Sequence, residues 1–461
     1  MSDAATHRPN KLFYPPHAKP LSGTERLPYV IWKLMRNPIE GFGPLSYRQS
    51  IASIKVMGIR MHVITGPDGM QSILNTHFDK FSKAPIDARI LGPATKEGLL
   101  SVHGDQWRRQ RRAVAPIFAQ RHMLDLAPSI NAVLQNFKRK LDLKPDVELN
   151  AAMADVTFDV LAKCLLGDPK GLDRERLKKA TRRVVTSAGT LRPDDMLPLP
   201  RNIPRPIGPV GRAALRSLKA AAEDLLKRRE GENLSDLARD DLVGLLTTAI
   251  DPKTGRKLSH SERRDNLIGF FIAGHETTAL TLTWALYLVG SHPPTAQRVR
   301  QEVLEICGEG DISYDNIKSL VFTRAVIDET MRLFPPAPIL NRECQSDCEI
   351  LGREIKKGDI LLLCSYVMHR RETYWPNPLA FDPDRFMDAP ELRSKSAPFM
   401  PFGAGPRICV GASFALMEAV IVLATLVRDY DIQIPKSCYP RPLMTVTLRP
   451  EGGINARLER V

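Results

Sequence analysis

The feature that most constrains this chain is a ten-residue loop around one cysteine, Cys409, which holds three glycines and a proline and leads into an apolar, helix-like run. We expect Gly405 and Gly411 to allow backbone conformations that a Cβ atom would prevent. Without a Cβ atom, the backbone can also approach a flat ring closely. A thiolate in such a loop suits axial ligation of a haem iron, where it donates electron density and favours O–O cleavage. Neighbouring backbone N–H groups would tune the sulfur, and the planar guanidinium of Arg407 matches a haem propionate. The alternative is a buried structural cysteine in a glycine-rich turn.

The segment from Phe402 to Gly411 resembles the cytochrome P450 haem-binding signature, Phe-x-x-Gly-x-Arg-x-Cys-x-Gly, and matches it at every specified position. The resemblance implies a mainly α fold with a small β portion, the cytochrome P450 fold, built around a long central oxygen-binding helix. It implies haem b as the cofactor, with Cys409 as the axial iron ligand. It also assigns Phe402, Gly403, Arg407 and Gly411 to the haem-binding loop.

Length and composition fit one large globular domain. The chain has 461 residues, of which 43% are hydrophobic and 26% charged, and no Gly/Ser linker, low-complexity tract or obvious repeat divides it. Such a composition supports a large core. We therefore expect a single domain over residues 1–461, with a smaller β-rich portion near the N-terminus. Residues 1–40 match the family only loosely.

The N-terminus and the cysteine count bear on localisation. The first eight residues are polar and resemble neither a signal peptide nor a membrane anchor. The one apolar run of membrane-spanning length, Phe271 to Val289, contains His275 and Glu276, which favours a buried core helix. Seven cysteines without a Cys-x-x-Cys pair favour a reducing compartment, and we expect Cys344 and Cys348 to be free thiols. The sequence thus predicts a soluble cytoplasmic protein of bacterial type without a transmembrane anchor.

The net charge is +14. Such a charge is typical of proteins that bind nucleic acid, anionic membranes or acidic protein partners. The basic residues are spread along the chain, and no recognisable nucleic-acid-binding motif accompanies them. We therefore expect no nucleic-acid partner and favour docking of an acidic electron carrier.

A long buried helix is predicted downstream of Ser259. The segment Ser259-His260-Ser261-Glu262 is a capping box, and the residues that follow are apolar on nearly all sides until Gly290 and Pro293 end the pattern. This gives a helix of about 30 residues. A helix that is apolar all round lies buried in the middle of a domain.

The centre of this helix breaks the apolar pattern with Ala273-Gly274-His275-Glu276-Thr277. The Thr277 hydroxyl can donate to the carbonyl of Ala273 four residues earlier, and Ala273 and Gly274 leave space for a small ligand. The segment resembles the family's oxygen-binding groove. The resemblance implies that Thr277 assists oxygen activation and that Glu276 relays protons from solvent. The alternative is a helix with ordinary threonines.

A structural ion-pair network is implied by two further segments. Glu329 and Arg332 share one helix face, and Arg385 follows in a Pro-Asp-Arg-Phe segment. This order resembles the family's Glu-x-x-Arg helix and its Pro-Glu-Arg-Phe-like segment, with Asp384 in place of the usual glutamate. The resemblance implies a buried Glu329–Arg332–Arg385 network that supports the haem-binding core.

Further basic residues are candidate contacts of the haem propionates. Trp107 and Arg111 are neighbours at i, i+4, and the resemblance implies that both bind one propionate. It implies that Arg342 reaches the other. A solvated basic helix is the alternative for Arg111. We expect Arg108, Arg109 and Arg112 to lie toward solvent and to be candidates for docking the electron carrier.

The substrate is expected to meet four mostly apolar segments, as a lipophilic molecule would require. They are Ile86 to Val102, the start of the long helix, Ala337 to Leu340, and Met444 to Val446. These segments can equally be plain core. The segment from Pro193 to Pro209 holds six prolines and is a candidate lid.

These features predict a haem-thiolate monooxygenase that inserts one atom of O2 into a lipophilic small molecule by hydroxylation or epoxidation. Because a short segment follows Cys409, we expect no fused flavin or iron–sulfur domain. We expect a monomer that takes electrons from a separate ferredoxin or flavodoxin and its NAD(P)H-dependent reductase. The alternatives are a peroxide-using haem-thiolate enzyme, against which the Glu276–Thr277 pair argues, and a non-catalytic haem-binding or gas-sensing protein.

Overall fold

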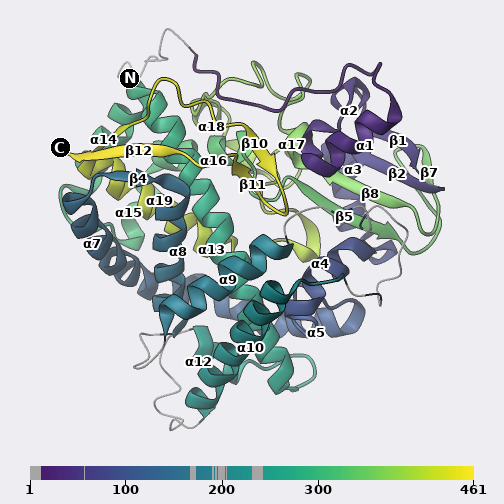
Figure 1. The fold of residues 1–461 in the computed structure, drawn as a ribbon, viewed down its shortest axis with the longest axis horizontal. Helices are drawn as coiled ribbons and strands as arrows, with labels where there is room; N and C mark the ends of the chain where they lie inside the picture. Colours follow the sequence, from purple (N-terminus) through teal and green to yellow (C-terminus); the bar gives the residue numbers. More distant parts are fainter. Residues whose placement is uncertain are drawn as a thin grey trace.

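Helices form most of this computed structural model and surround one long helix, α13 (Figure 1). The structure describes residues 12–56, 58–166, 173–188, 192, 195, 203, 205–230 and 242–461. The helices that come before α13 are α1 (Leu27–Arg36), α2 (Pro44–Arg48), α3 (Pro67–Gln71), α4 (Pro85–Thr95), α5 (Gly104–Val114), α6 (Gln120–Met123), α7 (Ala127–Leu143), α8 (Leu149–Leu166), α9 (Arg174–Ala188), α10 (Pro209–Glu230) and α12 (Leu242–Thr248). Those from α13 onward are α13 (His260–Ser291), α14 (Pro293–Cys307), α15 (Tyr314–Ser319), α16 (Val321–Leu333), α17 (Ser365–Met368), α18 (Arg385–Asp388) and α19 (Ala412–Asp429).

Helix α13 begins and continues as its sequence predicts. The Ser259 hydroxyl accepts from the Glu262 N–H, and the Glu262 carboxylate accepts from the Ser259 N–H, so the capping box is present. The helix ends at Ser291, between Gly290 and Pro293, as predicted. A Cβ atom at Gly290 would lie 2.8 Å from the carbonyl oxygen of Ile432. This glycine therefore also allows close packing of a strand against the helix.

The β portion is small and divided: the largest sheet lies at the right of the molecule in Figure 1, and β4 and β12 of a second sheet lie at the opposite side. The largest sheet has the strand order β1-β2-β8-β5-β3, in which only β2 and β8 pair in parallel. It joins strands from the N-terminal part with β5 and β8, so it is not purely N-terminal as expected. The strands are β1 (Ile51–Val56), β2 (Ile59–Ile64), β3 (Phe81–Lys83), β4 (Asp146–Glu148), β5 (Ile339–Cys344), β6 (Cys348–Ile350), β7 (Arg353–Ile355), β8 (Ile360–Cys364), β9 (Tyr430–Gln433), β10 (Pro442–Met444), β11 (Leu448–Pro450) and β12 (Asn455–Arg460).

The main apolar core lies between α13 and the helices packed on it. Trp284 of α13 stacks on Phe334 at the end of α16, with ring centroids 3.8 Å apart, and both side chains are fully buried. Helices α8, α16 and α19 all pack against α13. This arrangement confirms the predicted mainly α fold with a long buried central helix. No helix in the described part of the chain is both long and apolar enough to cross a membrane.

Candidate functional site

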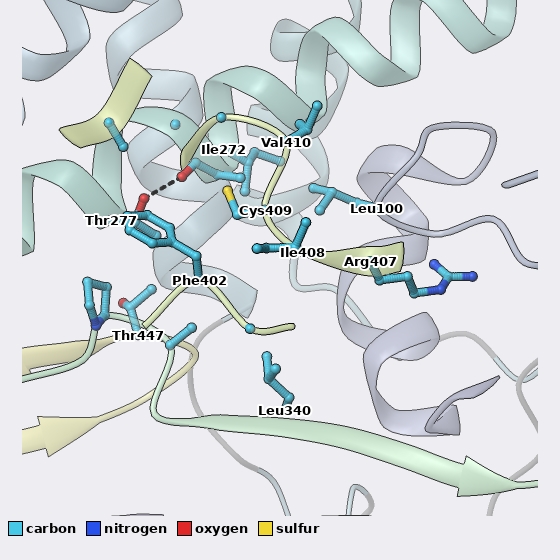
Figure 2. A pocket seen from close by; sticks show the side chains of 18 of the residues that line it. Leu100, Ile272, Thr277, Leu340, Phe402, Arg407, Ile408, Cys409, Val410 and Thr447 are labelled. Atoms are coloured by element: carbon cyan, nitrogen blue, oxygen red, sulfur yellow. Dashed lines mark hydrogen bonds between the residues drawn. The ribbon is translucent and has the colours of Figure 1, made fainter. Parts of the chain in front are cut away.

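A cavity of about 490 Å³ lies beside the middle of α13, between the cysteine loop, β5 and the α4–α5 region. Side chains from segments far apart in the sequence meet here, as Figure 2 shows for Thr277, Cys409 and Thr447. The predicted cofactor, oxygen and substrate residues that line it are Trp107, Arg111, Ala273, Gly274, Glu276, Thr277, Arg342, Phe402, Gly403, Arg407, Cys409 and Gly411. The structure therefore brings all of these predicted site residues to one space.

The Cys409 thiol opens onto this cavity while its backbone is held by the loop. The Cys409 N–H donates to the Phe402 carbonyl oxygen at 3.0 Å, which closes the loop. Burial among protein atoms raises the pKa of the Cys409 thiol, while the Gly411 N–H and the positive charge of Arg111 act to lower it. A backbone donor thus lies where it can tune the sulfur, as the sequence analysis expected. A soft thiolate donor facing a cavity is a suitable ligand for iron.

The glycines of the loop have different roles. Gly405 has φ +69°, and a Cβ atom there would lie 1.9 Å from the carbonyl oxygen of Leu74. Gly403 has φ +73° and lies beside Leu340. Gly411 has φ −91°, which any residue adopts, and a Cβ atom there would meet only Phe118 at 4.0 Å. The prediction that Gly411 needs a conformation closed to other residues is wrong; it keeps the cavity wall open instead.

Three arginines face the cavity with few protein acceptors. Arg342 donates to the Asn341 carbonyl at 2.9 Å, and Arg407 donates to the Val102 carbonyl at 3.3 Å. The Arg111 guanidinium makes no hydrogen bond or ion pair with another residue in the part of the chain that the structure describes. Burial lowers the pKa of all three, and it lowers that of Arg407 to about 10 with help from the positive charge of Arg342.

Two further side chains lie beside these arginines. We call Arg111, Arg342, Arg407 and Trp107 the basic wall, and Lys83 lies next to it. Lys83 of β3 lines the same cavity and donates to the Leu100 carbonyl. Burial lowers its pKa to about 8, while the negative charge of Asp87, which also lines the cavity, acts to raise it. The ring of Trp107 lies under the Arg407 guanidinium, with the guanidinium carbon 4.2 Å from the ring centroid, an arrangement that the sequence analysis missed. Buried cations are costly unless paired with anions. The wall therefore fits a ligand with carboxylates at this end, and the two propionates of haem meet that requirement.

The centre of α13 has the predicted local geometry at Thr277. Its hydroxyl donates to the Ala273 carbonyl oxygen at 2.7 Å (Figure 2). Ala273 is exposed to the cavity, as expected. A Cβ atom at Gly274 would lie 3.3 Å from the side chain of Leu161. Gly274 therefore mainly lets α8 approach α13 and contributes less open space than predicted.

The Glu276 carboxylate is bound by a turn more than 170 residues away in the chain. It accepts a hydrogen bond from the Thr447 hydroxyl at 2.8 Å and forms an ion pair with Arg449 of β11. Burial raises the pKa of Glu276, and Arg449 and Thr447 act to lower it. The sequence analysis missed both partners. The only signal was its choice of the adjacent segment Met444 to Val446 as a cavity candidate.

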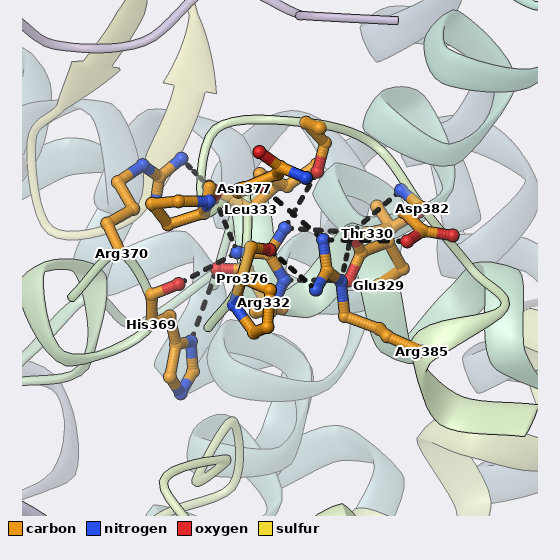
Figure 3. A network of polar contacts seen from close by, with 12 residues as sticks. Glu329, Thr330, Arg332, Leu333, His369, Arg370, Pro376, Asn377, Asp382 and Arg385 are labelled. Atoms are coloured by element: carbon orange, nitrogen blue, oxygen red, sulfur yellow. Dashed lines mark hydrogen bonds and ion pairs between the residues drawn. The ribbon is translucent and has the colours of Figure 1, made fainter. Parts of the chain in front are cut away.

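The predicted Glu329, Arg332 and Arg385 side chains meet in the interior (Figure 3). Arg332 binds both carboxylate oxygens of Glu329, at 2.7 and 2.8 Å, and Arg385 donates to Glu329 at 3.1 Å. The remaining Arg332 N–H groups donate to the carbonyls of His369, Pro378 and Ala380. Every donor of Arg332 therefore has an acceptor, although the residue is completely buried.

His369 connects this network to the cysteine loop, and the sequence analysis did not single it out. Its Nδ1 lies 3.2 Å from the Arg332 carbonyl oxygen, and its Nε2 accepts from the Met400 N–H at 3.2 Å. Burial lowers the pKa of His369 to about 3, with further lowering from Arg332 and Arg370. A neutral imidazole that donates through Nδ1 and accepts through Nε2 satisfies both contacts. Met400 lies two residues before Phe402, so the network supports the start of the loop.

Three arginines of α5, Arg108, Arg109 and Arg112, form ion pairs that the sequence did not predict. Arg109 forms an ion pair with Glu262 and is mostly buried. Arg112 binds both carboxylate oxygens of Asp251, at 2.6 and 2.8 Å. Arg108 pairs with Asp79 and Asp105. The expectation that these side chains lie toward solvent agrees with Arg108 and Arg112, whose side chains are 42% and 35% exposed, and is wrong for Arg109. Acids from neighbouring segments pair with all three.

The candidate substrate segments contribute unequally. Some residues of the ranges Ile86 to Val102 and Ala337 to Leu340 line the cavity, as do residues of the first half of α13. Of the predicted segment Met444 to Val446, only Val446 lines it. The Asp265 and Asn266 side chains of α13 accept from the backbone N–H groups of Glu97 and Leu99 and so fix the α4–α5 connection. Most of the proline-rich candidate lid lies outside the described residues.

Comparison with known proteins agrees with this geometry. The family model described as "Cytochrome P450" matches residues 46–455. The chain is similar to "Taurochenodeoxycholic 6 alpha-hydroxylase" of Sus scrofa, with 28% identity over 87% of this chain and 82% of that protein. It is similar to "Cytokinin hydroxylase" of Arabidopsis thaliana, with 31% identity over 78% of this chain and 72% of that protein. It is also similar to "Cytochrome P450 4V2" of Rattus norvegicus, with 28% identity over 81% and 75% of the two chains.

Proposed function

This chain belongs to the cytochrome P450 family of oxygen-incorporating monooxygenases, and we propose that it hydroxylates or epoxidises a lipophilic small molecule. The observation that carries the proposal is the meeting of the Cys409 thiol, the basic wall and Thr277 in one largely apolar cavity. A lipophilic substrate is favoured because apolar side chains from α4, α13 and β5 make up most of the remaining lining.

The family implies haem-thiolate binding, and we propose haem b in this cavity. Cys409 would be the axial ligand. The loop residues Phe402, Gly403 and Gly411 would contact the ring face, and the propionates would bind the basic wall of Trp107, Arg111, Arg342 and Arg407. When bound, haem supplies the redox chemistry that activates dioxygen.

The chain's own residues would orient the substrate and move protons. Thr277 carries a hydroxyl at the cavity surface that can turn from the Ala273 carbonyl toward a ligand. Glu276, the adjacent acid, would take up protons from solvent and pass them into the cavity. The apolar lining would exclude bulk water from this space.

Electrons would come from a separate ferredoxin or flavodoxin and its NAD(P)H-dependent reductase. The net charge of +14 supports an acidic carrier. Because Arg108, Arg109 and Arg112 are paired with acids, we propose that other basic residues of the surface bind the carrier. We further propose one catalytic domain that acts as a cytoplasmic monomer; a main core that includes Ala18 and Leu458 supports the single domain.

The absorption spectrum of the purified, reduced, carbon-monoxide-bound protein tests this proposal. A strongly red-shifted Soret band that disappears in Cys409→Ser but persists in Cys438→Ser is expected, because only a thiolate ligand produces it. Titration with lipids and terpenoids should then change the iron spin state for molecules that fit the cavity. A spectrum typical of a histidine-ligated haem in the wild type would refute the proposal.

A further inference from the structure

The carboxylate of Glu276 is bound by Thr447 and Arg449, and not by the adjacent Thr277. Glu276 Oε1 accepts from Thr447 at 2.8 Å and from the Arg449 guanidinium, while the Thr277 hydroxyl donates to the backbone of its own helix. Thr447 lines the cavity, but Arg449 does not and has a quarter of its side chain exposed to solvent. The Glu276 carboxyl therefore lies between the cavity and a solvent-facing cation.

The charged surroundings of Glu276 are simple. Arg449 is the charged group that acts on it. Lys178 of α9 acts on the adjacent His275, whose pKa is lowered to about 4 by burial, so that imidazole is neutral at pH 7. At the N-terminal part of α13, Arg264 and Asp265 pair with each other. The protonation of Glu276 thus depends on burial, which favours the neutral acid, and on Arg449, which favours the carboxylate.

We propose that Arg449 is a positioning residue for oxygen activation: together with Thr447 it holds Glu276 as an anchored carboxylate on the β10–β11 turn and sets when that acid takes up a proton. The inference rests on the proposed function. In this scheme the carboxylate accepts a proton from water on the Arg449 side, which forms a carboxyl O–H bond and weakens the ion pair. The released side chain then turns toward Thr277 and gives the same proton to the cavity, which restores the carboxylate. No electron is transferred in either step.

The scheme predicts that removing the cation disturbs proton supply without disturbing the haem site. In Arg449→Gln we expect Glu276 to remain protonated to a pH higher by about 1 to 3 units, since a neighbouring cation lowers a carboxyl pKa by that amount. The fraction of reducing equivalents that reaches product should fall about threefold to tenfold at pH 7, and peroxide release should rise. Arg449→Lys should recover most of the coupling, because it keeps the charge. Thr447→Val should have a smaller effect, because it removes one hydrogen bond and no charge.

A second readout does not depend on turnover. A raised carboxyl pKa means that the folded protein binds the proton more tightly than the unfolded chain, so stability falls as pH rises from the unfolded to the folded pKa. In Arg449→Gln this fall should extend to higher pH than in the wild type. It should vanish in Arg449→Gln/Glu276→Gln, where no acid remains to titrate.

The experiment measures coupling, peroxide release and thermal midpoint between pH 5 and 9 in these variants, with the carbon monoxide spectrum recorded for each. Arg457→Gln is the matched control, since it removes an arginine from an exposed ion pair on β12 and should change none of them. Unchanged coupling and an unchanged pH profile in a haem-replete Arg449→Gln would overturn the inference. Equal loss in Arg449→Gln and Arg449→Lys would also overturn it. Absence of the red-shifted Soret band in the wild type would instead refute the proposed function.

Discussion

Two groups of arginines in this molecule differ in how their guanidinium groups are satisfied. In the Glu329–Arg332–Arg385 network every Arg332 N–H has a protein acceptor. Two N–H groups donate to the Glu329 carboxylate and three donate to backbone carbonyls. In the basic wall, Arg342 and Arg407 each donate to one backbone carbonyl, and Arg111 has no partner among the described residues. We call the first region saturated, because every Arg332 N–H has a protein acceptor, and the basic wall unsaturated. A saturated region stabilises the fold, whereas an unsaturated region has donors left for a ligand.

The largest effect is expected from a substitution in the saturated region. Arg332→Ala leaves the Glu329 carboxylate buried without its bidentate partner and removes the guanidinium hydrogen bond to the His369 carbonyl, which should cost about 3–5 kcal/mol. We expect haem-free or insoluble protein, measured by expression yield and haem content. Soluble, haem-replete Arg332→Ala protein would contradict a structural role for this network.

Thr277→Ala should leave both arginine regions intact and change only the chemistry. The haem content and spectrum should match the wild type, while the fraction of NAD(P)H electrons recovered in product falls about tenfold or more. Product and peroxide are quantified against NAD(P)H consumed. Thr283→Ala is a suitable control, since this hydroxyl also donates to its own helix but is buried away from the cavity. Unchanged coupling would remove Thr277 from the mechanism.

The saturated region should also be sensitive to acid through His369. Its folded pKa of about 3 lies below the ordinary histidine pKa of 6.5, so the unfolded chain takes up a proton that the folded protein excludes. The stability contribution is therefore complete above pH 6.5 and decreases as pH falls toward 3, by about 2 kcal/mol at pH 5. Thermal unfolding from pH 7 to 5 measures this, and His369→Gln should flatten the dependence. An equally steep pH dependence in the variant would assign it to other groups.

Arg342→Gln tests the unsaturated region in the opposite sense from Arg332→Ala. Because Arg342 is desolvated and has few acceptors, the apoprotein should keep its stability or gain some. Haem should bind about tenfold more weakly, as expected for loss of one charge-assisted hydrogen bond. Haem transfer to an acceptor protein gives the affinity. Unfolding of the apoprotein would show that Arg342 belongs with the structural arginines.

The smallest effect should come from the last glycine of the cysteine loop. Gly411→Ala should change stability by less than about 1 kcal/mol, since its φ is ordinary and space is available. Gly405→Ala should be much more harmful, because its Cβ would collide with the Leu74 carbonyl. Thermal midpoints of the two holoproteins make the comparison. Equal losses would mean that the haem itself, and not the backbone, excludes a side chain at Gly411.

Much of the site was predictable because its parts are local. The capping box of α13 and the Thr277 hydrogen bond to Ala273 join residues three or four positions apart, so helical periodicity alone places them together. The mainly α fold was implied by the resemblance of the cysteine loop to the cytochrome P450 signature, and the burial of α13 followed from its length and apolar character. By contrast, the close packing of Gly290 against the distant strand β9 could not be predicted, since it depends on tertiary structure.

The sequence by itself determined the chemistry: a cysteine in a glycine-rich loop, an acid and a hydroxyl in a buried helix, and arginines in excess of nearby acids. Only the tertiary structure decided which of these groups are paired. It neutralised Arg109 with Glu262, bound Glu276 to Arg449, and placed His369 between Arg332 and Met400. The physical reason is that a charged side chain is satisfied by whichever partner folding brings within about 4 Å, and sequence separation carries no information about that distance.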